Sequence, residues 1–107
     1  MHNSTTLHPG GVLAEKLHSI GISVLELARR IGVPNNRLYL ILDGRRTITA
    51  DTALRLGRFF DTGPDYWLNL QKDYELDEAR QKIGDYLNNI EPYARPTLPE
   101  GKQARLH

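Results

Sequence analysis

The chain has 107 residues, 39% hydrophobic and 25% charged, a balance typical of one small globular domain with a modest core. It contains no cysteine, which excludes disulfides and thiolate metal sites, and no apolar run near the ~20 residues that a membrane-spanning helix needs. Its first residues lack the apolar centre of a signal peptide, so we expect a cytoplasmic protein without a membrane partner.

The net charge of +1 conceals an uneven distribution along the chain. Residues 23–60 carry seven arginines against three acids, a net +4, whereas residues 61–91 carry eight acids against three bases, a net −5. This division predicts two surfaces that face different partners. The alternative is that both are solvated faces without a partner.

Hydrophobic spacing and turn residues predict an all-α chain in four parts. Residues 1–8 are a flexible N-terminus, residues 9–75 a helical domain, residues 76–91 a C-terminal helix and residues 92–107 an extended or disordered tail. The first helix is expected to begin at Pro9, because the first helical position does not need its N–H, and to end at Gly21.

The stretch SVLELARRIGVPNNRLYLILDGRR, which begins at Ser23, predicts two short helices joined by a tight turn. Ser23 is a helix N-cap, and Glu26 three positions later completes the pattern of a reciprocal capping box. Gly32 suits the end of the first helix, Pro34 the first residue of the second, and Gly44 its end. Such a helix-turn-helix places the first residues of its second helix against base edges in the DNA major groove.

Two more helices are expected before the C-terminal segment. Thr49 can cap a helix from Ala50 to Phe60, and Pro64 can start the next. Gly57 costs a helix interior about 1 kcal/mol relative to alanine, which predicts a close helix crossing there. Trp67 has the helical spacing of a core residue.

Charged and apolar residues in the second half of the chain form two further patterns. Asp51 and Arg55 are spaced for an ion pair on one helix. From Leu76 onward the apolar residues form a nearly heptad strip, with acids on the other faces. That strip predicts docking on the chain's own bundle, on a second copy or on a foreign protein.

The segments HPGGVLAEKL, SVLELARRIGVPNNRLYLILDGRR, ITADTALRLGRFF and YWLNLQKDYEL closely resemble the HigA/VapI-type antitoxins of the XRE/Cro helix-turn-helix class, from about His8 to about Ala79. The resemblance implies a five-helix, lambda-repressor-like DNA-binding domain that forms a homodimer and binds double-stranded operator DNA. It also implies that the protein represses its own operon and neutralises a RelE/HigB-like, mRNA-cleaving toxin of a type II toxin–antitoxin module.

The chain departs from that class at two positions. Val24 stands where most members have a glutamine that contacts phosphate, so that contact is missing. Leu40 lies on the groove side of the second helix, where the class often has a polar base-reading residue. Leu40 either meets a thymine methyl group or marks weaker sequence reading.

The first turns of the second helix carry most of the predicted DNA contacts. Asn35 and Asn36 suit adenine, because an amide can both donate and accept at its major-groove edge, or they bind phosphate at the helix N-terminus. Arg37 suits either a guanine or a phosphate. Tyr39 either bonds a phosphate or packs on Arg37.

Three further residues are expected at the sugar–phosphate backbone. Arg45 and Arg46 follow the second helix, where two adjacent charges suit counterion release better than base reading. Ser23 caps its helix in either case, and its hydroxyl or N–H could also reach a phosphate. The alternative for Arg45 and Arg46 is a basic loop without a partner.

Enzymatic chemistry finds little support in the sequence. The four histidines are scattered without metal-ligand spacing, and no Gly-rich phosphate loop or nucleophile elbow occurs. We therefore expect no catalysis, no cofactor, no metal site and no small-molecule ligand.

Several alternatives to the antitoxin interpretation stay open. The chain could be a protein-interaction module with little specific DNA binding, which Val24 and Leu40 favour, or a stand-alone XRE-class regulator without a toxin. A binder of single-stranded nucleic acid would need exposed aromatics among the arginines, which are lacking here. If a toxin is bound, the acidic C-terminal part or the bundle itself is the expected surface, because opposite charges favour encounter with a basic ribonuclease.

Overall fold

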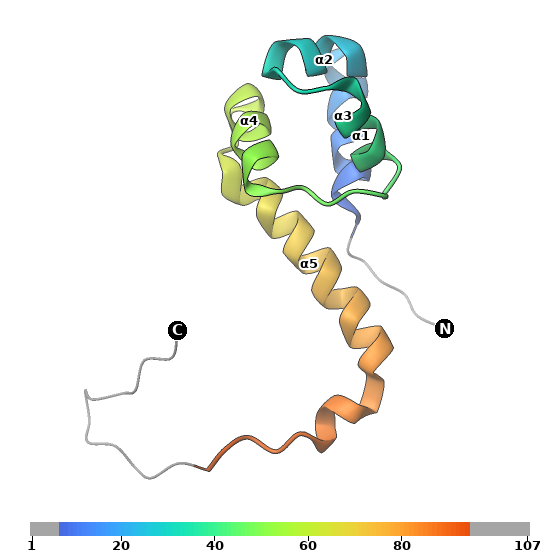
Figure 1. Ribbon diagram of the computed structural model, residues 1–107, viewed down its shortest axis with the longest axis vertical. Coiled ribbons are helices and arrows are strands. Elements are labelled where there is room, and N and C mark those ends of the chain that lie inside the picture. Colours follow the sequence, from blue (N-terminus) through green and yellow to red (C-terminus); the bar gives the residue numbers. More distant parts are fainter. Residues whose placement is uncertain (1–6, 95–107) are drawn as a thin grey trace, which may run out of the picture.

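The computed structural model describes residues 7–94, which contain five α-helices, one 3-10 helix and no β-strand. The elements are α1 (Pro9–Ile20), α2 (Val24–Ile31), α3 (Asn35–Leu42), α4 (Ala50–Phe60), α5 (Pro64–Ile83) and the 3-10 helix η1 (Gly84–Asn89). The first four helices and the start of α5 form a compact head, and the rest of α5 projects from it as a stem (Figure 1). The predicted all-α, five-helix fold is confirmed.

Most helices begin and end at the predicted residues. The Ser23 hydroxyl accepts a hydrogen bond from the backbone N–H of Glu26 at 3.0 Å, and Gly21 and Gly32 close α1 and α2 with φ of +73°. The Glu26 carboxylate bonds Arg29 and Arg30 instead of completing the reciprocal capping box.

Pro34 differs from its prediction by one position. It is the N-cap of α3 rather than the first helical residue, because its ψ of 143° is extended and the helix begins at Asn35. This extended residue completes the turn between α2 and α3.

The core of the head collects residues from every α-helix. Trp67 is fully buried, as predicted, and its ring lies 5.7 Å from the ring of Phe60 and 5.2 Å from that of Tyr66. The buried hydrophobic residues are Leu13, Leu17, Leu27, Ala28, Ile31, Val33, Leu38, Ile41, Ile48, Ala53, Leu56 and Trp67. Burial of this set fixes the helix-turn-helix on the other helices.

The close approach predicted at Gly57 is confirmed. A Cβ atom there would overlap the backbone of Gly63 and Pro64, where the chain turns from α4 into α5. Gly10 has the same role at the start of α1, since a Cβ would overlap the backbone of Ile41 and Leu42 at the end of α3. These two contacts fix α1 against α3 and α4 against α5.

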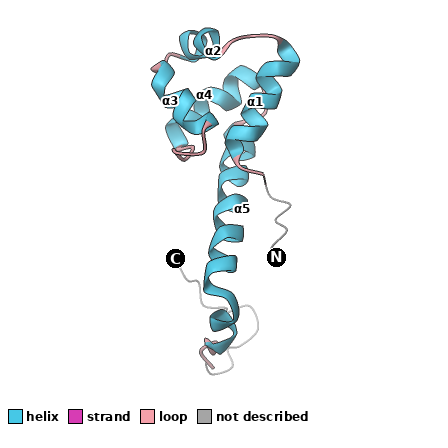
Figure 2. Cartoon of the chain, turned by 90° about the vertical axis from the view of Figure 1, so that its right-hand side faces the viewer, coloured by secondary structure: helices cyan, strands magenta, loops and turns pink. Residues whose placement is uncertain are grey.

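The predicted division between a helical domain that ends at residue 75 and a separate helix 76–91 is not what the structure shows. α5 runs without a break through this boundary to Ile83, and the shorter η1 follows (Figure 2). No proline or helix-ending glycine occurs between Pro64 and Gly84, so the helix continues although its apolar pattern changes.

The predicted loose N-terminus includes one residue that the structure orders. His8 is the N-cap of α1: its Nδ1 accepts from the N–H of Gly10 at 2.8 Å, and its ring packs edge-on against Tyr74 at 4.8 Å. Residues 1–6 and residues 95–107, which include most of the predicted tail, lie outside the described part of the chain. Within the described part, no helix is long and apolar enough to cross a membrane.

Candidate nucleic-acid interface

The second helix of the helix-turn-helix, α3, has one buried side and one exposed side. Leu38 and Ile41 are fully buried, whereas Asn35 and Asn36 are exposed at its first turn, and Tyr39 is 50% exposed. The buried pair fixes the rotation of α3 about its axis, so the polar residues of the first turn face solvent. This arrangement allows an outside ligand to contact them.

The N-terminus of α3 lacks both a capping side chain and an acid in its first turn. Pro34, its N-cap, has no side-chain hydrogen-bond acceptor to offer. The first backbone N–H groups of a helix without such a cap can donate to an outside anion, and the helix dipole favours negative charge there. The exposed Asn35 and Asn36 therefore lie at a helix end that suits either a base edge or a phosphate.

Arg45 and Arg46 follow α3 and are both exposed, as their proposed role requires. Arg45 lies 3.7 Å from the carboxylate of Asp43, with 72% of its side chain exposed, so this pair is weak and can reorient. Leu40 is partly buried and lines a shallow hollow together with Tyr39 and Arg45.

The first helix of the motif shows what replaces the class's glutamine. Val24 packs against the hydrophobic core, and it carries no polar group that could bond a phosphate. Ser23 beside it is exposed, with its hydroxyl already accepting from the N–H of Glu26. A hydroxyl can still donate its proton while it accepts, so a phosphate contact by Ser23 is compatible with the cap.

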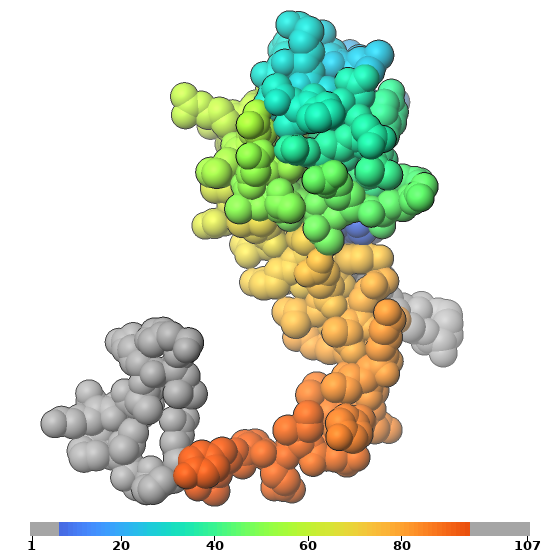
Figure 3. All heavy atoms as spheres, in the orientation of Figure 1, coloured from blue at the N-terminus to red at the C-terminus, as the bar shows by residue number. Residues whose placement is uncertain are grey.

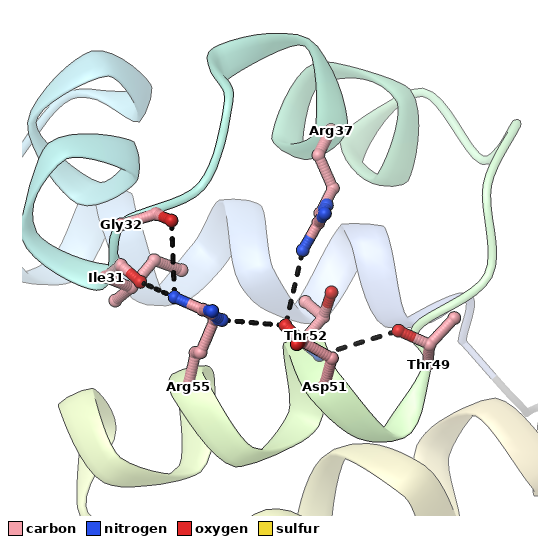
Figure 4. A network of polar contacts seen from close by, with 7 residues as sticks. All are labelled: Ile31, Gly32, Arg37, Thr49, Asp51, Thr52 and Arg55. Atoms are coloured by element: carbon pink, nitrogen blue, oxygen red, sulfur yellow. Dashed lines mark hydrogen bonds and ion pairs between the residues drawn. The ribbon is translucent and has the colours of Figure 1, made fainter.

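The side chain of Arg37 points in a different direction from those of the other candidate residues. Its side chain is only 25% exposed and points from α3 toward α4, where its Nη1 lies 3.4 Å from Oδ1 of Asp51 (Figure 4). Its Nε is buried and has no hydrogen-bond partner among the described residues. In this conformation Arg37 joins α3 to α4.

Asp51 is the centre of a polar network that spans three helices (Figure 4). It also accepts from Nε of Arg55 at 2.7 Å, the ion pair predicted from their spacing, and this bond lowers the pKa of the Asp51 carboxyl. Arg55 Nη1 donates to the backbone carbonyls of Ile31 at 2.7 Å and Gly32 at 3.2 Å, at the end of α2. The network therefore connects α4 to both helices of the helix-turn-helix.

A second connection was not visible in the sequence. The buried Gln71 of α5 accepts from the backbone N–H of Ile48 at 2.9 Å, and its amide donates to Glu75 at 3.0 Å. This bond fixes the segment between α3 and α4, next to Arg45 and Arg46. It joins residues 23 positions apart, a separation at which no local pattern signals a partner.

The sequence of this chain is similar to those of known proteins with a helix-turn-helix. Residues 13–67 match the Helix-turn-helix family, which is just over half of the chain. Virulence-associated protein I of Dichelobacter nodosus is 43% identical over 76 residues, which cover 70% of this chain and 70% of that protein.

Two solved structures resemble most of the chain. An addiction module antidote protein of the HigA family from Coxiella burnetii is 44% identical with a TM-score of 0.80, covering 84% of this chain and all of that one. The antitoxin HigA of Pseudomonas aeruginosa, solved with the higBA promoter, is 38% identical with a TM-score of 0.76, covering 83% of this chain and 99% of that one.

Proposed function

Since the chain belongs to the Helix-turn-helix family and, within it, to the HigA/VapI-type antitoxins, we propose that it is a DNA-binding antitoxin of a type II toxin–antitoxin module. It acts as a homodimer that binds operator DNA, represses its own operon and neutralises a RelE-like, mRNA-cleaving toxin. The binding of promoter DNA by the related HigA of Pseudomonas aeruginosa supports DNA as the first of these partners.

The observation that carries this proposal is the exposed first turn of α3. Asn35 and Asn36 read base edges there or hold a phosphate at the helix N-terminus, and Leu40 meets a thymine methyl group. Tyr39 bonds a phosphate through its hydroxyl. Both asparagines project from a helix whose rotation is fixed by buried residues, which is a requirement for reading sequence rather than charge.

The remaining candidates contact the DNA backbone or hold α3 in position. Ser23, Arg45 and Arg46 contact phosphates on either side of α3. We assign Arg37 a different primary role from the one its position in the sequence suggested. While it is paired with Asp51, it positions α3 instead of contacting a base.

A homodimer would present two copies of α3 to one duplex. Two recognition helices address half-sites whose centres are about 34 Å apart, one helical turn of DNA, so the operator is expected to be a palindrome. Repression follows if that palindrome overlaps the promoter of the protein's own operon.

The acidic second half of the chain is the proposed surface for the toxin. Along the stem, η1 and the residues directly after it, the acids are Asp73, Glu75, Asp77, Glu78, Asp85 and Glu91. A basic ribonuclease would be attracted by this surface, while DNA would be repelled from it. The two partners therefore bind at different ends of the molecule.

The DNA-binding part is tested by fluorescence anisotropy with the protein's own upstream DNA and a scrambled duplex, at two salt concentrations. We expect the native duplex to bind about 10³-fold more tightly, as specific proteins typically do. Equal binding to both duplexes with a steep salt dependence would mean that the arginines bind phosphates without recognising the base sequence. This result would refute specific operator binding.

The toxin-binding part is tested with the product of the adjacent reading frame. Deletion of residues 76–107 is expected to abolish binding while the head stays folded, because every buried core residue in the described part of the chain lies before residue 76. Full neutralisation of the toxin by this truncated chain would contradict the proposed surface.

The rival function is a protein-interaction module with little specific DNA binding. Two features favour it: Val24 packs inward without a polar group, and Leu40 has an apolar side chain where a polar base-reading residue is expected. Binding of the adjacent gene product without any preference for the upstream DNA would support this alternative. Specific DNA binding without such a product would instead support a stand-alone regulator.

A further inference from the structure

The connector between α3 and α4, residues 43–49, carries Arg45 and Arg46 on its exposed part. Its start is bonded to the end of α3, because the backbone N–H of Arg45 donates to the carbonyl of Leu40 at 2.8 Å. Near its other end, Ile48 is only 3% exposed and belongs to the hydrophobic core. In Figure 3 this green part of the chain lies at the lower edge of the head, directly above the stem. The two arginines therefore lie between one fixed point in α3 and a second at Ile48.

The second fixed point includes one buried hydrogen bond. The backbone N–H of Ile48 donates to Oε1 of Gln71 at 2.9 Å, and Gln71 is 6% exposed. Among the described residues, this is the one hydrogen bond that joins the connector to an element other than α3 and α4. A buried N–H without an acceptor is costly, so loss of the Gln71 oxygen would favour a displaced connector whose N–H reaches water.

Glu75 determines which end of the Gln71 amide faces the connector. Its carboxylate accepts from Nε2 of Gln71 at 3.0 Å. An ionised carboxylate can only accept, so it keeps the NH₂ group of the amide on its own side and leaves the oxygen for Ile48. Trp67, one turn earlier on α5, is fully buried and fixes the rotation of this helix. Gln71 is therefore held in the orientation that the connector needs.

The buried position of Gln71 means that any effect on DNA must act through the connector above it. Arg45 and Arg46 are exposed there, and Arg45 has only a weak ion pair with Asp43. A mobile segment that becomes ordered on binding loses conformational entropy, which weakens the complex. A connector that is already held in place before DNA binds avoids much of this loss.

We propose that Gln71 is a positioning residue for the contact with the DNA backbone. Its hydrogen bond to Ile48 holds the connector in the conformation in which Arg45 and Arg46 reach phosphates. The inference rests on the DNA binding of the proposed function and adds a residue of α5 to it. Gln71 acts on the charge-dependent part of the affinity, whereas the first turn of α3 supplies the base-dependent part.

The test is fluorescence anisotropy of the full chain on operator and scrambled DNA over a series of salt concentrations. Gln71→Met removes both hydrogen-bonding groups and keeps the length of the side chain. We expect it to weaken binding to both duplexes by the same factor, about tenfold, and to reduce the salt slope by about one to two, because the two arginines lose phosphate contacts. The preference for the operator should stay unchanged.

Gln81 provides the matched control on the same helix. It also donates to a carboxylate four residues away, that of Asp77 at 3.3 Å, but it is exposed and lies about 15 Å further along the stem. Gln81→Met should leave the affinity and the salt slope at their wild-type values. Circular dichroism verifies that each variant remains helical.

A double-mutant cycle separates positioning from a general loss of stability. If Gln71 acts through the two arginines, Gln71→Met should cause no further loss of affinity in the Arg45→Ala/Arg46→Ala background. A purely structural role would lower the affinity by the same factor in both backgrounds, and this result would overturn the inference.

The reciprocal variant Gln71→Glu/Glu75→Gln decides the question even if Gln71→Met does not fold. The new carboxylate at position 71 can accept both from Ile48 and from the new amide at position 75, and the net charge is that of the wild type. We expect wild-type affinity and salt slope. Gln71→Glu alone places two carboxylates within hydrogen-bond distance, where they repel, and should bind more weakly. A helical reciprocal variant that binds no better than Gln71→Glu would overturn the inference.

The remaining outcomes distinguish this inference from the proposed function. A wild-type chain that binds the operator, with unchanged affinity and salt slope in Gln71→Met, overturns the inference alone. If Gln71→Met instead loses the preference for the operator, the hydrogen bond acts on α3 and the inference is also overturned. If the wild-type chain binds neither duplex, the proposed function fails and the inference fails with it.

Discussion

Asp51 accepts hydrogen bonds from Arg55 on its own helix and from Arg37 on α3, while Arg55 in turn bonds the last carbonyls of α2. All of these groups are close to solvent, and exposed ion pairs contribute little to the free energy of unfolding. Their effect is on the relative positions of the helices, because they connect α4 to both helices of the helix-turn-helix, α2 and α3. A residue of this kind is better tested by DNA affinity than by thermal stability.

The substitution Asp51→Asn is expected to lower the affinity for operator DNA a few-fold, because Arg37 and Arg55 lose their shared carboxylate and α3 is held less firmly. Anisotropy titrations with operator DNA measure this effect. Asp43→Asn is the matched control: it removes an exposed carboxylate that, within residues 7–94, pairs with Arg45 alone, and it should leave the affinity unchanged or raise it. Wild-type affinity in Asp51→Asn would contradict the positioning role.

His8 predicts a pH dependence of stability. Burial lowers the pKa of its imidazole below 6.5, an effect that the nearby Glu78 partly offsets, and its Nδ1 must be unprotonated to cap α1. The stabilisation is therefore complete above pH 6.5 and is lost as the pH falls from 6.5 toward the lowered pKa. Thermal melts from pH 8 to pH 5 should show a falling melting temperature.

The variant His8→Asn isolates this effect. Asparagine is a good N-cap that does not titrate, so the part of the pH dependence that His8 causes should disappear. A wild-type pH profile in this variant would assign the dependence to another group.

At the level of secondary-structure elements, two glycines in helices have opposite surroundings. Gly57 faces the backbone of Gly63 and Pro64 at the turn into α5, whereas Gly11 in α1 has no neighbouring atom within 4 Å of a Cβ position. Alanine has the higher helix propensity, so intrinsic preference predicts that both substitutions stabilise. The surroundings of Gly57 reverse this expectation there.

We therefore expect Gly57→Ala to destabilise the protein by about 1–3 kcal/mol, because a Cβ forces α4 away from the turn into α5. Gly11→Ala should instead stabilise it by up to ~1 kcal/mol. Urea denaturation of both variants measures the difference. Equal effects of the two substitutions would mean that close packing at Gly57 does not limit the fold.

Much of this architecture could be predicted from the sequence, because it depends on local signals. Capping residues such as Ser23 and Thr49, and glycines in the left-handed conformation such as Gly32, mark helix ends within a few positions. The length of α5 was predicted wrongly, because the change in its apolar pattern near Leu76 is not a helix break.

Contacts between distant positions are the part that local patterns miss. The local sequence of α3 predicts that Arg37 contacts DNA. Only the packing of α3 on α4 brings Oδ1 of Asp51 within 3.4 Å of its Nη1. The hydrogen bonds from Arg55 to Ile31 and from Ile48 to Gln71 are of the same kind. Each joins residues that approach only after the helices have packed.

At the scale of the whole molecule, the two halves of the charge pattern are separated in space. The basic stretch 23–60 lies in the head, and the acidic stretch 61–91 continues from the head along the stem and η1 (Figure 1). One end therefore suits a polyanion such as DNA, and the other a basic protein or a second copy. We propose that the head reads DNA sequence through the first turn of α3.

The most direct test compares two double variants on operator and scrambled DNA by fluorescence anisotropy. Asn35→Ala/Asn36→Ala should remove most of the preference for the operator and keep the salt dependence, because phosphate contacts remain. Arg45→Ala/Arg46→Ala should weaken both duplexes alike and reduce the salt slope by about two. If the asparagine variant keeps the full preference for the operator, α3 does not read the sequence through its first turn, and the account is contradicted.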